Sequence, residues 1–94
     1  MAIKAKTKKS KVVNKSVKAK IVRNIAGPRI LAIRKELGIS QIKFASELSK
    51  KIEFMDQASV SRIENQQRGI TDIELIQIAR ILKVTVEWLL TGKK

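Results

Sequence analysis

The sequence contains no cysteine and no histidine among its 94 residues. Without cysteine, neither a disulfide framework nor a thiolate metal site can form. Without histidine, the chain lacks the commonest metal ligand and the commonest general base. It also has no glycine-rich phosphate-binding loop, and its acidic residues fall at predicted helix starts and on exposed helix faces. We therefore expect no enzyme, no metal and no cofactor, and the lack of cysteine favours the cytoplasm.

Long hydrophobic runs and aromatic residues are scarce as well. No apolar stretch approaches the roughly 20 residues that a membrane-spanning helix needs. Residues 1–13 hold too many lysines for the core of a signal peptide. The aromatic residues are two Phe and one Trp, which is few for stacking on single-stranded bases. These absences disfavour a membrane protein, a secreted protein and a single-strand binder.

What the chain has in excess is positive charge. Lysine and arginine number 21 and acidic residues 8, which gives a net charge of +13. Nine of the cations lie in residues 1–27, where there is no acid, and the other 12 leave residues 28–94 at +4. Such a field favours a polyanionic partner, which charge alone does not identify. We predict a basic arm, residues 1–27, disordered before binding because like charges repel, and one folded domain, residues 28–94.

The predicted domain carries a repeated helix-start pattern. An apolar residue precedes a capping Ser, Thr or Asp, and a second apolar residue follows five positions after the first. The pattern begins at Ile39, Met55, Ile70 and Val84. An earlier helix is also predicted, because Pro28 suits the first helical position and Gly38 suits the residue after the last turn. The sequence thus predicts an all-α fold with helices near 28–37, 41–49, 57–64, 72–82 and 86–91.

Two of these helix starts share a further feature, a capping residue followed at once by glutamine, in Ser40-Gln41 and Asp56-Gln57. A helix N-terminus offers free N–H groups to a phosphate. A glutamine amide offers the donor and the acceptor that match the major-groove edge of adenine. The small Ala45 would let another helix cross closely. Together these features favour recognition of double-stranded DNA.

An ordered set of motifs around these starts resembles the phage-repressor-like (Cro/C1, XRE-type) helix-turn-helix family. The motifs are Gly38-Ile39-Ser40-Gln41, Phe44-Ala45, Leu48, Ser61-Arg62-Ile63-Glu64-Asn65 and Val84-x-Val86-x-Trp88-Leu89-Leu90. The resemblance covers about residues 28–92. It implies a five-helix lambda-repressor-like DNA-binding domain whose third helix is the recognition helix. One departure is the segment 49–54, which is longer than the family's usual turn between its second and third helices.

The resemblance also implies roles for individual residues. The base-contacting side chains would be Gln57, Ala58, Ser61 and Arg62. The phosphate contacts would come from Gln41, Lys43 and Ser59 and from the backbone and side chains of Asn65, Gln66, Gln67 and Arg68. Gln41 would in addition orient Gln57. Arg34 and Glu64 match a family ion pair that ties the first helix to the end of the third.

Three functional interpretations follow. The leading one is a sequence-specific transcriptional regulator, a repressor, that binds double-stranded DNA as a homodimer without a small-molecule ligand. The candidates for the dimer contact are Trp88, Leu89, Leu90, Ile76 and Ile81, and core packing is an equal alternative for the tryptophan. The second is the antitoxin half of a toxin–antitoxin pair, or another protein-binding module with secondary DNA binding. The third is a nucleoid-type or RNA-binding protein dominated by its arm.

Overall fold

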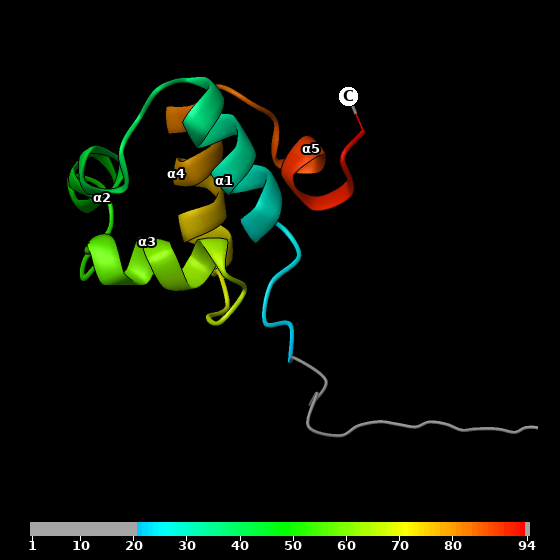
Figure 1. Ribbon diagram of the computed structural model, residues 1–94, viewed down its shortest axis with the longest axis horizontal. Coiled ribbons are helices and arrows are strands. Elements are labelled where there is room, and N and C mark those ends of the chain that lie inside the picture. The colour runs from blue at the N-terminus through cyan, green and yellow to red at the C-terminus, as the bar shows by residue number, and fades with distance from the viewer. Residues whose placement is uncertain (1–20, 94) are drawn as a thin grey trace, which may run out of the picture.

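The computed structural model describes residues 21–93, which form five helices and no strand (Figure 1). The helices are α1 (Gly27–Glu36), α2 (Gln41–Ser49), α3 (Gln57–Glu64), α4 (Asp72–Leu82) and α5 (Val86–Thr91). The predicted all-α, five-helix fold is confirmed, and only α1 is displaced from its predicted range, by one residue. Across residues 21–93 no helix has the length and apolar character needed to cross a membrane. Most of the predicted basic arm, residues 1–20, lies outside the described residues.

Local capping explains where four of the helices begin. The side chains of Ser40, Asp56, Thr71 and Thr85 each accept a hydrogen bond from the backbone N–H three residues later. Such a bond satisfies one of the free donors in the first turn of a helix. At α4 the cap is reciprocal, because Glu74 also accepts from the backbone N–H of Thr71, at 3.0 Å. These four starts are encoded by residues next to them in the sequence.

The start of α1 combines a local hydrogen bond with a tertiary contact. Its N-cap residue, Ala26, provides no side-chain cap, and Asn24 Oδ1 accepts from the backbone N–H of Gly27 at 2.7 Å. A Cβ atom at position 27 would collide with the backbone carbonyl oxygen of Ile63. Glycine therefore lets the start of α1 approach the end of α3 closely. As a result, α1 begins one residue earlier than predicted and Pro28 occupies its second position.

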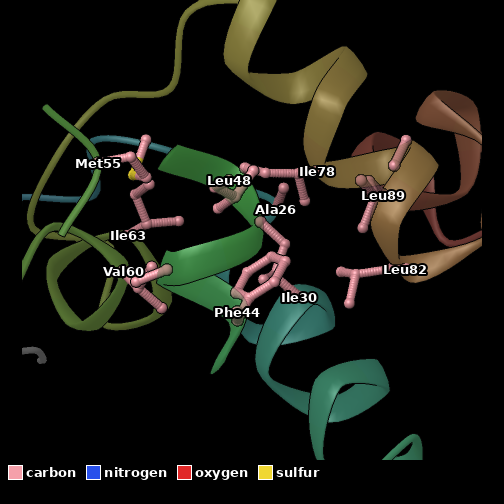
Figure 2. Close-up of a cluster of buried hydrophobic side chains, with 12 residues drawn as sticks. Ala26, Ile30, Phe44, Leu48, Met55, Val60, Ile63, Ile78, Leu82 and Leu89 are labelled. Carbon is pink, nitrogen blue, oxygen red and sulfur yellow. The ribbon is translucent and has the colours of Figure 1, made fainter. Parts of the chain in front are cut away.

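The core draws side chains from all five helices (Figure 2). Its largest fully buried members are Phe44, Ile30, Leu48, Ile63, Ile78, Leu82, Leu89 and Val60. Burial of each aliphatic side chain contributes about 1.5–3 kcal/mol to stability. Around this core α2 packs on α3 and α4, α1 packs on α3 and α4, and α5 packs on α4. In Figure 1, α3 is the lowest of the five helices, and the loop that follows it lies near the start of the described chain.

Candidate nucleic-acid interface

The helix α3 has one apolar face and one polar face. Val60 and Ile63 lie in the core, each 1% exposed. Gln57, Ala58 and Arg62 are exposed and Ser61 is half-buried. With 3.6 residues per turn, positions 57, 58, 61 and 62 fall on one side of a helix. The four residues predicted to contact bases therefore lie together on the outer side of α3.

A chain of hydrogen bonds leads from the α1–α3 contact to the first residue of α3. Arg34 donates from Nε and Nη2 to the two carboxylate oxygens of Glu64, at 2.5 and 3.1 Å. Gln41 Nε2 donates to Glu64 Oε1 at 3.0 Å. Gln57 Nε2 donates to Gln41 Oε1 at 3.3 Å. Two pairs that were predicted separately, Arg34 with Glu64 and Gln41 with Gln57, are thus joined in one network.

The ion pair in this network is almost entirely removed from water. The side chains of Arg34 and Glu64 are 8% and 2% exposed. The remaining Nη1 of Arg34 donates to the backbone carbonyl oxygen of Ile39 at 2.6 Å, in the connection between α1 and α2. Buried charges of this kind are tolerated when each is paired and hydrogen-bonded. The pair therefore ties α1, the start of α2 and the end of α3 together.

Three of the residues predicted to contact phosphates by side chain, Lys43, Asn65 and Gln67, are exposed. Lys43 lies in the first turn of α2, and its Nζ is 3.4 Å from a carboxylate oxygen of the half-buried Glu47. Asn65 and Gln67 follow the end of α3, and Asn65 Nδ2 donates to Ser61 Oγ at 3.5 Å. Asn65 and Gln67 thus lie beyond the last residue of α3, and the half-buried Gln41 contacts its first residue, Gln57.

Ser59 and Arg68, which were also expected near phosphates, are used inside the domain. Ser59 is 6% exposed, and its hydroxyl donates to the carbonyl oxygen of Phe54 at 3.5 Å. The guanidinium of Arg68 donates to both carboxylate oxygens of Glu74, at 2.9 and 2.8 Å. This bond lowers the pKa of Glu74 and raises the pKa of Arg68. The polar side-chain groups of both residues therefore already have partners within the domain.

Sequence reasoning missed Asn24, which joins the incoming chain to the end of α3. Its Nδ2 donates to the carbonyl oxygens of Ile63 and Arg68, at 3.0 and 2.8 Å. Gln66 Nε2 donates back to the carbonyl oxygen of Asn24 at 3.0 Å. The backbone N–H of Arg23 donates to the carbonyl oxygen of Gln66 at 3.1 Å. Packing against the domain therefore begins before residue 28, the predicted start of the domain.

Comparison with known proteins bears directly on this arrangement. Residues 30–89 match the sequence profile of a helix-turn-helix family. The chain belongs to this helix-turn-helix family. Its fold is similar to the solved structure of the P22 c2 repressor in complex with a synthetic operator in the presence of Tl+. That match has a TM-score of 0.64 and 23% identity and covers 74% of this chain and 98% of the other. No curated protein sequence matches the chain.

The connection between α2 and α3, residues 50–56, is longer than a tight turn. Met55 anchors its far end in the core, whereas Phe54 is 90% exposed and has a φ of +61°. Despite the longer connection, α2 still packs on α3, and the amides of Gln41 and Gln57 meet.

Within residues 21–93 no cluster of acidic side chains is placed to hold a metal ion.

Proposed function

We propose that this helix-turn-helix protein is a sequence-specific, non-enzymatic transcriptional repressor that inserts α3 into the major groove of double-stranded DNA. The observation that carries the proposal is the outer side of α3, where Gln57, Ala58, Ser61 and Arg62 lie together. A glutamine amide can pair with adenine, and an arginine guanidinium can pair with guanine, both in the major groove. Binding at a promoter would exclude the transcription machinery by occupying its site.

In this proposal, backbone contacts set the register of the protein on DNA. Gln41, Lys43, Asn65 and Gln67 flank the reading side chains and would contact phosphates on either side of them. Contacts of this type position a protein and carry no sequence information. Ser59 and Arg68 are left out because their polar atoms are already bonded within the domain.

We further propose that two copies of the chain bind one operator together and contact each other through the surface formed by α5 and the outer side of α4. Leu90 and Ile76 are 37% and 43% exposed, and Trp88 and Ile81 are partly buried against the core. Leu89 is fully buried and is therefore excluded from the contact. Dimers of this type place their recognition helices in successive major grooves, about 34 Å apart.

The basic arm would add contacts that do not depend on sequence. Residues 1–20 include eight lysines and no acid. Deletion of residues 1–20 should lower affinity for every duplex and reduce the slope of log affinity against log salt by about 0.9 per lost phosphate contact. A fluorescence-anisotropy salt titration measures this slope, and an unchanged slope would reduce the arm to a solubility tail.

The decisive experiment for base reading is selection of bound fragments from random duplex DNA with the full chain. A repressor that binds as a dimer should enrich two half-sites one helical turn apart. Gln57→Ala and Arg62→Ala should each weaken the selected site by about 1–3 kcal/mol and leave random DNA unaffected. Arg80→Ala is the matched control, because it removes an equal charge from an exposed position on α4. Equal losses on selected and random DNA would instead indicate nonspecific binding.

A further inference from the structure

The hydrogen bonds that join Glu64, Gln41 and Gln57 run in one direction. A carboxylate only accepts hydrogen bonds, so Gln41 must turn its NH2 group toward Glu64 Oε1, at 3.0 Å. This leaves Gln41 Oε1 for Gln57, whose NH2 group donates to it at 3.3 Å. Arg34 holds Glu64 in place by binding both of its carboxylate oxygens. The charge of one buried residue thereby sets the orientation of two amides.

The orientation of the Gln57 amide decides what it offers to a base. One of its two N–H groups is used by Gln41, which leaves one donor and one acceptor, Oε1. Adenine presents an acceptor, N7, and a donor, N6–H2, in the major groove, whereas guanine presents two acceptors, N7 and O6. The remaining donor and acceptor of Gln57 match adenine, and Oε1 would repel O6 of guanine. With its amide reversed, Gln57 would present two N–H groups, which guanine accepts.

We infer that Glu64, acting through Gln41, is a positioning residue that makes Gln57 select adenine over guanine. Glu64 is 4% exposed, so it acts on the base only through the intervening amide. The inference rests on the proposed insertion of α3 into the major groove. It adds a specific role for the α1–α3 ion pair, which would otherwise only hold two helices together.

The readout is the ratio of affinities for two duplexes. One duplex is the site selected by the wild-type chain. The other differs from it at one base pair, where guanine replaces an adenine. That adenine is the one at the position where Gln57→Ala no longer prefers any base. A purely structural role for Glu64 would change both affinities equally and leave the ratio unchanged. We expect the wild-type chain to prefer adenine by about fivefold or more, which is the lower end of discrimination by a bidentate contact.

Two variants interrupt the network at different points. Gln41→Met removes the intervening amide and keeps the ion pair. Arg34→Met combined with Glu64→Leu removes the anchor, keeps both glutamines, and leaves no unpaired buried charge. In Gln41→Met the adenine preference should fall to within about twofold, because the Gln57 amide can then adopt either orientation. In the double variant the preference should fall less far, because the phosphate contact proposed for Gln41 still acts on its amide. Ile63→Val is the control, since it shortens a buried side chain of α3 and should keep the wild-type ratio.

Circular dichroism verifies that each variant is folded before its ratio is measured. If the double variant does not fold, the side-chain amide protons of wild-type Gln41 provide the test by NMR exchange, with the exposed Gln67 as reference. Exchange of Gln41 several-fold slower than that of Gln67 supports the anchor. Equal exchange, or an unchanged ratio in either folded variant, overturns the inference. Failure of the proposed function itself would look different, because the wild-type chain would then enrich no sequence.

Discussion

Two arginine–glutamate pairs hold this domain together, and they differ in their surroundings. Arg34 and Glu64 join α1 to the end of α3, with side chains 8% and 2% exposed. Arg68 and Glu74 join the loop after α3 to the first turn of α4, with side chains 29% and 9% exposed. The first pair also binds Gln41, whereas the second also accepts from the backbone N–H of Thr71. The same chemistry therefore supports the polar outer side of α3 in one place and a helix start in the other.

The largest expected effect is the loss of the more buried pair. Glu64→Ala leaves the Arg34 guanidinium buried without its counter-charge and should lower the free energy of unfolding by about 3–5 kcal/mol. Chemical denaturation at pH 7 measures this loss. Glu53→Ala is the control, because Glu53 is exposed and its removal should change stability by less than about 0.5 kcal/mol. Similar losses in the two variants would contradict the distinction drawn between buried and exposed carboxylates.

The second pair should contribute less. Glu74→Ala removes the bonds to Arg68 and the reciprocal cap of α4, and we expect a loss of about 2 kcal/mol at pH 7. The partial exposure of Arg68 lets water screen this pair, which makes its loss smaller than that of the Arg34–Glu64 pair. The same denaturation series compares the two variants, and a larger loss for Glu74→Ala than for Glu64→Ala would reverse the comparison.

The contribution of Glu74 should also depend on pH. Its hydrogen bonds from Arg68 lower its pKa in the folded state below the ordinary value of 4.5. The ionised form is thus favoured by folding, so its contribution is present above pH 4.5 and is lost as pH falls through the lower, folded-state pKa. The stability difference between the wild-type chain and Glu74→Gln should shrink below about pH 4.5. A difference that stays constant from pH 7 to pH 3 would show that the charge of Glu74 contributes nothing.

The smallest expected effect concerns DNA. Because the guanidinium of Arg68 is already bound to Glu74, Arg68→Ala should leave the slope of log affinity against log salt nearly unchanged. Lys43→Ala removes an exposed cation in the first turn of α2 and should reduce the slope by about 0.9 if Lys43 contacts a phosphate as proposed. Salt titrations of the two variants on one duplex decide between them. A similar reduction for Arg68→Ala would restore it as a phosphate contact.

Much of the fold could be predicted from the sequence because its signals are local. Capping residues such as Ser40 and Asp56 lie directly before the helices they start, and Gly38 ends α1 with a φ of +72°. The contact of Asn24 with the end of α3 has no such signal. Its bond from the backbone N–H of Gly27 is local, but the carbonyl oxygens of Ile63 and Arg68 lie 39 and 44 positions away. Arg68 illustrates the same limit, because an arginine in the loop after α3 could bind a phosphate or an acid on the next helix. Only the packed structure distinguishes the two.

The hydrogen bonds of Asn24 have a practical consequence for exchanging tails between relatives. They attach the backbone just before α1 to the turn that follows α3. The segment that leads into α1 is therefore held against the domain by hydrogen bonds. A chimera that receives a foreign tail should therefore keep residues 23–27 of the recipient and be spliced before Arg23. A splice at Pro28 would remove Asn24 and its hydrogen bonds together with the tail.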